Sequence, residues 1–515
     1  MTQPKTAIVI GAGVAGLATA ALLGKEGVAT TVVDKLPAHG GRAGSETVGG
    51  FSFDTGPSWY LMPEAFDHFF ALFGKRTEDL LDLVPLSPAY RLFPESQEPI
   101  DVEPGRDNAT AMFESIEPGA GAQLAAYLDS AEEAFDLAIA NFLYTDFRSL
   151  EPLRNLRGNY AKLARYLTEP IDRFVAKRFR DTRLRQMLTY PAVFLSSHPS
   201  RTPSMYHLLT HTDLGQGPRY PQGGFAAVMD ALYELAREQG VQFRFNTEVA
   251  AITHSGRKAT GISLIDGTTL TADTIISCAD LHHTETRLLP KEKRTYKEEW
   301  FAPRDPGLGT VLVMLGVEGE LPELTHHNFL FSDDWLPDFD AVFDGPVASR
   351  PLGASKSIYV CKPSATDPTV APAGSENLFV LVPVPAAESI GHGDMYHDQA
   401  SPQVELIADE AIARIAERCG VEGLEQRIVV KQTLGPQDFG ERYHAWSGGS
   451  IGPAHTLRQS AFLRGQNRSR KLDNLYYAGA TTTPGVGVPM CLISAENVLK
   501  RLRGDHSPGP LPEAL

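Results

Sequence analysis

Three glycines within six residues constrain the fold of this chain more than any other feature. Gly11, Gly13 and Gly16 follow an apolar, β-branched run over residues 6–10 and precede a helical pattern over residues 17–27. With this spacing the first glycine permits a tight turn, the second lets the backbone approach a pyrophosphate, and the third lets the helix pack closely on the strand. The free N–H groups at the start of such a helix attract phosphate. The spacing therefore predicts that the chain folds around a dinucleotide.

Asp34 supports the same interpretation. It ends a second strand pattern, residues 30–34, about 20 residues after the glycines, where an acidic residue binds ribose hydroxyls. The strand, the glycine turn, the helix and the second strand together form a βαβ unit, which predicts an α/β fold with a Rossmann-type lobe. The alternative is a chance glycine-rich turn, and the agreement of all four parts argues against it.

The segment that follows favours FAD over NAD. In flavoproteins that resemble the amine oxidases, a Gly-Gly-Arg segment lies along the extended FAD, and this chain has Gly40, Gly41 and Arg42. A guanidinium matches phosphate oxygens bidentately, so Arg42 would pair with a phosphate; the alternative is a surface salt bridge. The sequence has no second G-x-G-x-x-G at a strand–helix junction. We therefore expect one permanently held FAD and no separate NAD(P)H site, as in an oxidase or in a dehydrogenase that feeds another acceptor.

A second glycine-rich loop near the C-terminus predicts another contact with the cofactor. A short strand over residues 475–478 leads into a loop over residues 479–487, and a helix follows over residues 488–503. The N-terminus of this helix can stabilise negative charge on a reduced flavin ring. A mere turn is the alternative, which the position directly before a terminal helix disfavours.

The length of the chain and the positions of its motifs predict two lobes. A single core stops growing well below 515 residues. Strand patterns in the middle and at the end of the chain return to the sheet with which it begins, so we expect a discontinuous FAD-binding lobe, formed by residues 1–75, 220–300 and 441–515. The remaining segments, 76–219 and 301–440, are expected to form an α+β substrate-binding and membrane-facing lobe.

Further motifs, taken in order along the chain, resemble those of the bacterial and fungal phytoene desaturases. These belong to the carotenoid branch of the amine-oxidase-like flavoproteins, with an amine-oxidase/GDI-like fold. The motifs lie at residues 11–16, 40–42, 53–57, 220–224, 327–328, 331–334, 453–461, 462–468 and 474–494. Two positions depart from the family. Residues 481–485 lack the glycine and the histidine of its Gly-Thr-His-Pro-Gly loop, so no histidine stands there to transfer a proton, and Asp34 replaces the frequent glutamate.

The resemblance implies an FAD-dependent enzyme that introduces double bonds into phytoene, towards neurosporene or lycopene. One hydrogen would leave as hydride to flavin N5 and the other as a proton, with oxygen or a quinone as the final electron acceptor. The substrate would be an apolar polyene from the membrane, held in a long apolar tunnel by burial worth about 0.8 kcal/mol per CH₂. Arg148, in a Phe-Arg segment, is the candidate catalytic residue, and a structural arginine is the equal alternative. The residues expected to hold FAD are Gly11, Gly13, Gly16, Asp34, Lys35, Gly41, Arg42, Gly56, Pro57, Ser58, Val249, Gly479, Gly487 and Val488.

Two other hypotheses stay open from the sequence. The first is a related FAD-dependent oxidoreductase that acts as a desaturase, oxygenase or isomerase on another carotenoid or isoprenoid, or as an amine oxidase. The second is a non-enzymatic prenyl-lipid carrier of the same fold that has lost the flavin. Such a carrier would need neither Arg42 with Asp34 nor the loop over residues 479–487, and all of them are present.

Net charge, cysteine spacing and the histidines limit which other ligands and partners the sequence predicts. The formal net charge of -16 repels phosphate, so nucleic acid is not expected. The four cysteines are far apart and form no CxxC pair, so neither a zinc site nor a disulfide framework is expected. His211, His327 and His455 are expected to be structural histidines. The oligomeric state stays open, with a homo-oligomer among the outcomes.

The sequence predicts a protein that can lie on a membrane but does not cross it. No apolar run reaches the roughly 18 residues that a spanning helix needs, and the N-terminus has no secretory signal pattern. Together with the resemblance, this implies a cytoplasmic protein at the inner face of the cell membrane. Helical periodicity is expected over residues 64–74 and 121–190. The aromatic stripe Phe66, Phe69, Phe70 and Phe73 either enters the membrane interface or belongs to the core.

Overall fold

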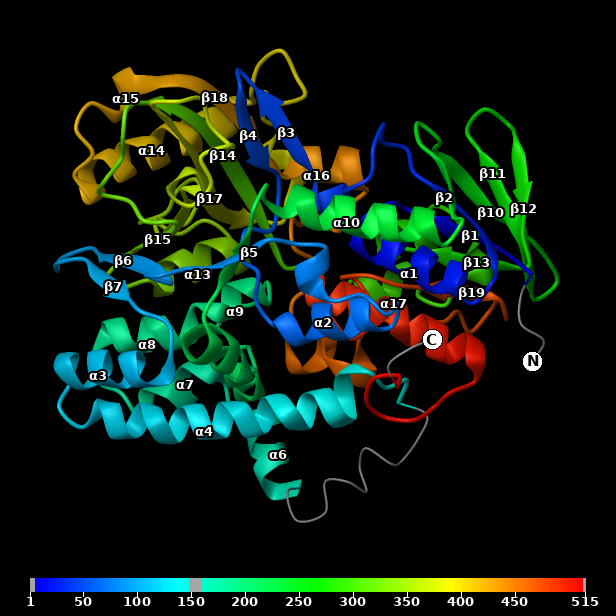
Figure 1. Cartoon of the computed structure of the whole chain (residues 1–515), viewed down its shortest axis with the longest axis horizontal. Helices are drawn as coiled ribbons and strands as arrows, with labels where there is room; N and C mark the ends of the chain where they lie inside the picture. Colours follow the sequence, from blue (N-terminus) through cyan, green and yellow to red (C-terminus); the bar gives the residue numbers. More distant parts are fainter. Residues whose placement is uncertain (1–4, 148–159, 513–515) are drawn as a thin grey trace.

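A five-stranded parallel sheet joins the beginning, the middle and the end of the chain. The computed structural model describes residues 5–147 and 160–512 (Figure 1). The strand order in this sheet is β19-β13-β1-β2-β9. All neighbouring strands run parallel, which confirms the predicted α/β class with a Rossmann-type lobe. The strands are β1 (Thr6–Ile10), β2 (Ala29–Val33), β9 (Gln242–Arg244), β13 (Thr274–Ser277) and β19 (Leu475–Tyr477).

Both faces of the parallel sheet are covered, as its uninterrupted apolar strands require. Alternate residues of β1 divide between two cores: Ala7 and Val9 face the helical side, and Ile8 and Ile10 face a three-stranded antiparallel sheet. The helices of the first side are α1 (Val14–Lys25), α2 (Pro63–Ala71), α10 (Phe225–Glu238) and α17 (Val488–Arg503). The antiparallel strands are β10 (Val249–Ser255), β11 (Lys258–Leu264) and β12 (Thr269–Thr271).

A seven-stranded mixed sheet forms the second half of the molecule, at the upper left of Figure 1. Helix α14 (Pro402–Cys419) covers one face through side chains such as Ile407 and Ile415. The opposite face, with Leu312 and Phe329, turns towards the helical layer below it. In spatial order the strands are β18 (Ile428–Leu434), β14 (Leu308–Glu318), β17 (Ser375–Pro385), β16 (Ile358–Cys361), β15 (His327–Phe331), β6 (Tyr90–Pro94) and β7 (Ile100–Val102).

The described part of residues 121–190 is mostly helical, as its periodicity predicts. Within the described residues this stretch is a series of separate helices, partly because Pro170 and Pro191 restrict where a helix can continue. Asp181 begins another helix by accepting a hydrogen bond from the Arg183 N–H. The helices of the layer are α3 (Arg106–Ile116), α4 (Ala120–Ala138), the π-helical turn Ile139–Leu143, α6 (Tyr160–Thr168), α7 (Ile171–Ala176), α8 (Thr182–Thr189) and α9 (Pro191–Phe194).

Shorter elements complete the chain. Two short antiparallel pairs are β3 (Ser45–Val48) with β4 (Phe51–Asp54), and β5 (Leu83–Pro85) with the distant β8 (Arg219–Pro221). The short helices are α11 (Leu281–Thr286), α12 (Glu298–Phe301), α13 (Leu336–Phe343), α15 (Leu424–Arg427) and α16 (Pro436–Tyr443).

The aromatic stripe belongs to the core, so its insertion into a membrane interface is excluded. Phe66, Phe69 and Phe70 are at most 1% exposed and Phe73 is 9% exposed. They pack in the same core as helices α1 and α17, because the apolar side of α2 faces inward. Among the described helices, none is long and apolar enough to cross a membrane.

Candidate functional site

A cavity of about 590 Å³ opens at the carboxyl ends of the parallel strands and continues over the inner face of the seven-stranded sheet. In open α/β sheets this edge is where ligands bind. All fourteen residues expected to hold FAD line it, from Gly11 to Val488. The volume lies within the range of about 300–1,000 Å³ that is typical of cofactor and ligand sites. Sequence reasoning therefore found residues that the fold brings together around one space.

The glycines at this edge have two different functions. A Cβ on Gly16 would lie 1.8 Å from the Gly11 carbonyl oxygen, and a Cβ on Gly56 would lie 2.0 Å from the Arg42 carbonyl oxygen. These two glycines permit close approach of backbone to backbone. A Cβ on Gly13 would meet nothing nearer than the Gly40 oxygen at 3.8 Å. The missing side chain of Gly13 thus leaves open space beside a helix N-terminus, which fits a pyrophosphate.

Asp34 is held at the end of β2 by two backbone donors. Its Oδ2 accepts a hydrogen bond from the Ala12 N–H at 2.7 Å, and its Oδ1 accepts one from the Leu36 N–H at 2.8 Å. Burial raises the pKa of Asp34, while these two hydrogen bonds oppose the rise. The side chain is fixed against the cavity, as a residue that binds a ribose must be.

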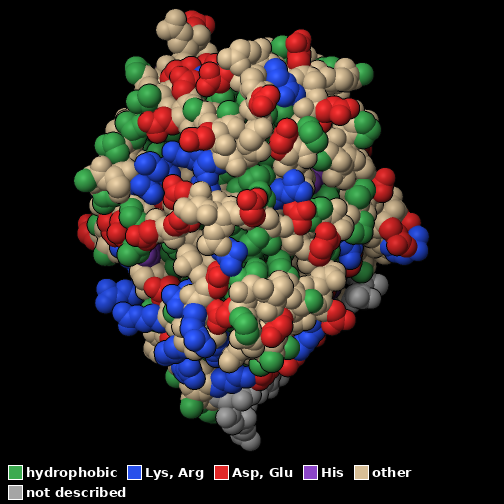
Figure 2. All heavy atoms as spheres, turned by 90° about the vertical axis from the view of Figure 1, so that its left-hand side faces the viewer, with side chains coloured by type: hydrophobic (Ala, Val, Ile, Leu, Met, Phe, Trp, Pro, Cys, Tyr) green, Lys and Arg blue, Asp and Glu red, His purple; other side chains and the backbone are tan. Residues whose placement is uncertain are grey.

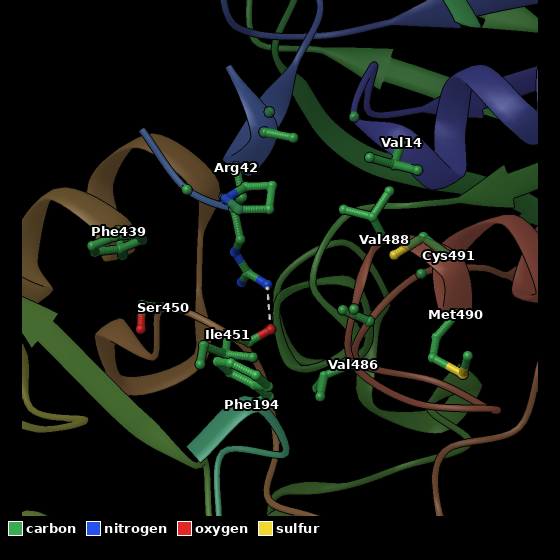
Figure 3. Close-up of a pocket in the computed structure, with 18 of the residues that line it drawn as sticks. Val14, Arg42, Phe194, Phe439, Ser450, Ile451, Val486, Val488, Met490 and Cys491 are labelled. Carbon is green, nitrogen blue, oxygen red and sulfur yellow. Dashed lines mark hydrogen bonds between the residues drawn. The ribbon is translucent and has the colours of Figure 1, made fainter. Parts of the chain in front are cut away.

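Arg42 has only long contacts within the described residues. Its Nη1 donates to the Ile451 carbonyl oxygen at 3.4 Å, and its Nη2 lies 3.7 Å from a carboxylate oxygen of Asp280. Figure 3 shows the side chain extended towards Ile451, across the cavity from Val488 and Cys491. Such contacts leave most of the donor capacity of a guanidinium available to an anion.

Arg442 is a cavity residue that sequence reasoning missed. It lies in α16, its guanidinium stacks 3.5 Å from the centroid of the Tyr396 ring, and its charge acts on Asp34. Its buried Nε has no hydrogen-bond partner among the described residues. Its Nη2 lies 3.7 Å from Glu46 Oε1, so the guanidinium adds a partly paired positive charge to this end of the cavity, which favours a phosphate. No local sequence pattern around residue 442 predicts that it lines the cavity.

His455 supports the C-terminal glycine loop. Its Nε2 lies 3.2 Å from the Val486 backbone nitrogen, and its Nδ1 lies 2.7 Å from the Tyr206 hydroxyl. A Cβ on Gly485 would lie 2.2 Å from this imidazole ring. Burial holds the pKa of His455 well below its usual range, so the ring is neutral. The contacts are those of a histidine that fixes a loop.

The part of the cavity farther from the glycines has an aromatic wall. Trp59 stacks on His327 with ring centroids 4.0 Å apart, and Tyr190 lies 4.6 Å from Phe329. Phe194, visible in Figure 3, lies against Trp59 at 5.5 Å. Further apolar side chains from the sheet extend this wall: Leu308, Leu312, Phe331, Phe379 and Leu381. The arrangement suits a long apolar ligand.

A buried carboxyl group lies directly behind this wall. Asp213 is 2% exposed, and its Oδ2 accepts a hydrogen bond from the Tyr190 hydroxyl at 2.7 Å. Its Oδ1 has no partner among the described residues. Burial raises the pKa of Asp213 to about 7. The tyrosine ring lines the cavity, so a hydrogen bond connects the cavity with a carboxyl group that can take up a proton near neutral pH.

An Asp213→Asn variant tests this raised pKa. The folded-state pKa of about 7 exceeds the ordinary 3.8, so the neutral carboxyl stabilises the fold fully below pH 3.8 and this stabilisation disappears as the pH rises through 7. At about 1.4 kcal/mol per pKa unit, the wild type should lose about 3 kcal/mol between pH 5 and pH 8 that the variant does not lose, because the loss accumulates from pH 5 up to the pKa of about 7. Urea unfolding at pH 5 and pH 8 measures this difference. The same substitution at exposed Asp398 serves as the control, and equal pH dependence of wild type and Asp213→Asn would contradict the assignment.

Arg148 lies outside the described residues. Its expected catalytic role stays a prediction. His211, the third expected structural histidine, lies 5.1 Å from the Phe135 ring and does not line the cavity.

The parallel sheet, the glycine turn and the acidic residue around one cavity define a dinucleotide-dependent oxidoreductase fold. The family model described as flavin containing amine oxidoreductase matches residues 14–499. The chain therefore belongs to the flavin-containing amine oxidoreductase family, and its cofactor is FAD.

Several relatives cover nearly the whole chain. A carotenoid 3,4-desaturase of Haloarcula japonica is 39% identical over 96% of this chain and 98% of its own length. A zeta-carotene-forming phytoene desaturase of Myxococcus xanthus is 33% identical over 97% of this chain and 94% of its own length. Among solved structures, an oxidoreductase from Methanosarcina mazei has a TM-score of 0.64 at 17% identity, covering 96% of this chain and all of that one. A putrescine oxidase has a TM-score of 0.60 at 13% identity, covering 97% and 99%. The structural similarities establish the fold.

Proposed function

We propose that this protein is an FAD-dependent carotenoid desaturase, which removes two hydrogens from neighbouring carbons of a polyene precursor. The observation that carries the proposal is the continuity of one cavity. The residues that fit a dinucleotide and the aromatic wall that fits a long hydrocarbon line the same space. The extent of similarity to two carotenoid desaturases supports it.

The cofactor end of the cavity would work through a few named groups. Gly13 leaves room for the pyrophosphate, Asp34 binds a ribose, and Arg42 pairs with a phosphate. The N-terminus of α17, which begins after Gly487, lines the cavity and would favour negative charge on a bound flavin ring. When bound, FAD supplies the acceptor for the hydride that leaves the substrate.

The substrate end would exclude water and receive the proton. The wall formed by Trp59, Phe194 and Phe329 orients the chain of the polyene by apolar contact. The second hydrogen leaves as a proton. We place its acceptance at the Tyr190 hydroxyl oxygen, which passes its own hydrogen to Asp213 Oδ2 across the 2.7 Å hydrogen bond.

The substrate proposed first is phytoene, and a 3,4-desaturation of a longer polyene is the second candidate. The second is favoured by the higher identity to the Haloarcula enzyme, 39% against 33% for the Myxococcus enzyme.

Expression in bacteria that accumulate either phytoene or lycopene separates the two candidate substrates, because each new double bond moves the absorption of the pigment to longer wavelength. Pigment chromatography should show new products in one strain. Unchanged pigments in both, with soluble flavin-loaded protein, would contradict carotenoid desaturation.

A basic surface on an acidic protein supports the proposed membrane association. Residues 160–185 hold eight Lys or Arg and three Asp or Glu, a net charge of +5 (8 − 3), whereas the whole chain has -16. These residues form α6, α7 and α8, at the lower left of Figure 1. Figure 2, viewed from that side, shows Lys and Arg side chains gathered on the lower part of the molecule. Basic side chains favour the anionic surface of a membrane.

Reversing two of these charges should weaken membrane binding. Arg173 and Arg180 are exposed, and an Arg173→Glu/Arg180→Glu variant should bind anionic vesicles at least about tenfold more weakly, since each basic side chain near such a surface contributes about 1 kcal/mol. Vesicle co-sedimentation at low and high salt measures the binding. Arg237→Glu, exposed on α10, is the matched control. Equal binding of all three proteins would contradict the assignment of this surface.

A further inference from the structure

Three buried donor groups from neighbouring strands meet behind the cavity wall. His326 directly precedes β15, His327 begins this strand, and Cys361 ends β16. His327 and Cys361 are direct cross-strand partners, so their side chains lie on the same face of the sheet. One ligand atom from each of the three residues lies within 4.8 Å of the others. The residues are 4%, 0% and 1% exposed, respectively.

Each of the two imidazoles uses one ring nitrogen in a hydrogen bond and has the other ring nitrogen unpaired within the described part of the chain. His326 Nδ1 lies 2.7 Å from the Thr366 hydroxyl, and His327 Nδ1 lies 2.7 Å from the Tyr359 hydroxyl. Neither Nε2 has a hydrogen-bond partner among the described residues, although both are buried. Metal-binding histidines characteristically anchor one ring nitrogen by such a hydrogen bond and present the other to the ion.

The protonation states suit a metal ligand set. Burial lowers the pKa of His326 to about 3 and that of His327 well below its usual range, so both rings are neutral and each has a lone pair to offer. Burial raises the pKa of the Cys361 thiol to about 12 without a metal. An ion that binds sulfur would displace this proton to solvent as the metal–sulfur bond forms. Lys362 lowers and Asp367 raises the pKa of His326, whereas at Cys361 a hydrogen bond with Tyr359 lowers the pKa and Asp54 raises it.

We propose that His326, His327 and Cys361 bind one thiophilic d¹⁰ metal ion, Zn²⁺ or Cu⁺. Two imidazoles and one thiolate are a ligand set for these ions, whereas Mg²⁺ and Ca²⁺ require oxygen ligands. Tyr359 and Trp59, which contact His327, line the cavity, so the ion would fix its wall from behind. The proposal rests on these contacts alone and is independent of the proposed substrate.

Metal analysis of the purified full-length holoprotein tests this site. The protein would be expressed with zinc or with copper supplement and freed from any histidine tag. Inductively coupled plasma mass spectrometry should find about one ion of Zn or Cu per chain. X-ray absorption should show one sulfur at about 2.3 Å from the metal ion and nitrogens at about 2.0 Å from it. The supplement that fills the site distinguishes the two ions.

A Cys361→Ser variant should lose at least about 80% of the bound metal, because the thiolate is its softest ligand. Cys419→Ser is the matched control, since Cys419 is also buried but lies in α14, and it should keep the metal. Circular dichroism and flavin content show whether the variants fold, and His326→Gln replaces Cys361→Ser if that variant does not. Wild-type protein without either metal, or metal content unchanged in the folded variant, would overturn the proposal.

Discussion

A Gly13→Val variant should fold and yet contain almost no FAD. The backbone of Gly13 is extended, with φ of -80° and ψ of -174°, a conformation that valine adopts readily. A new Cβ would meet no protein atom nearer than 3.8 Å, so the branch point of the side chain fits without displacing the backbone. The isopropyl group instead fills the space at the helix N-terminus where the pyrophosphate would lie. We expect flavin content to fall from about one per chain to below about 0.1.

Absorption spectra of the purified variant measure this loss, and circular dichroism verifies the fold. Gly215→Ala is the control. Its new Cβ would also make ordinary contacts, 3.7 Å from the nearest atom, and Gly215 does not line the cavity. Full flavin content in folded Gly13→Val would contradict the proposed pyrophosphate position.

The second large effect is expected from a charge in the aromatic wall. Phe194→Glu should retain FAD but convert a carotenoid substrate at least about 100-fold more slowly, because an unpaired carboxylate in an apolar site costs several kcal/mol. Phe194 lies at the end of the short helix α9, is half-buried and lines the cavity, where it packs against the rings of Trp59 and Tyr190. Pigment yield in the accumulating strain, together with flavin content, separates loss of substrate binding from loss of cofactor.

Two control variants delimit this expectation. Phe194→Leu preserves an apolar wall and should retain most of the activity. Leu406→Glu places the same charge on an exposed position of α14 and should have no effect. Wild-type conversion by Phe194→Glu would show that the polyene does not pass this part of the cavity.

The cofactor end of the cavity could be predicted because the sequence patterns that define it each involve only a few neighbouring residues. The turn at Gly11, the close approach at Gly16 and the acidic end of β2 depend on a few neighbouring residues, each with a backbone reason. The short apolar strands were recognisable for the same reason. The predicted fourteen residues consequently surround one cavity, although they come from three distant segments.

The rest of the cavity depends on contacts between distant segments, which local patterns do not encode. The hydrogen bond between Tyr190 and Asp213 depends on the packing of the helical layer. The effect of the Arg442 charge on Asp34 depends on the position of α16. The cross-strand pair of His327 and Cys361 arises from the register of β15 and β16. The amphipathic spacing of the aromatic stripe of α2 is typical both of a core helix and of a helix at a membrane interface. The burial of these side chains in the structure shows that they belong to the core.

Anaerobic single-turnover spectroscopy of the purified protein tests the central claim most directly. The protein would be mixed with phytoene in liposomes, and flavin and polyene absorption would be followed together. Desaturation predicts that the oxidised flavin absorption bleaches as a longer conjugated polyene appears, with one double bond formed per flavin reduced. Flavin that stays oxidised with phytoene and with lycopene, yet bleaches with dithionite, would contradict hydride transfer from a carotenoid.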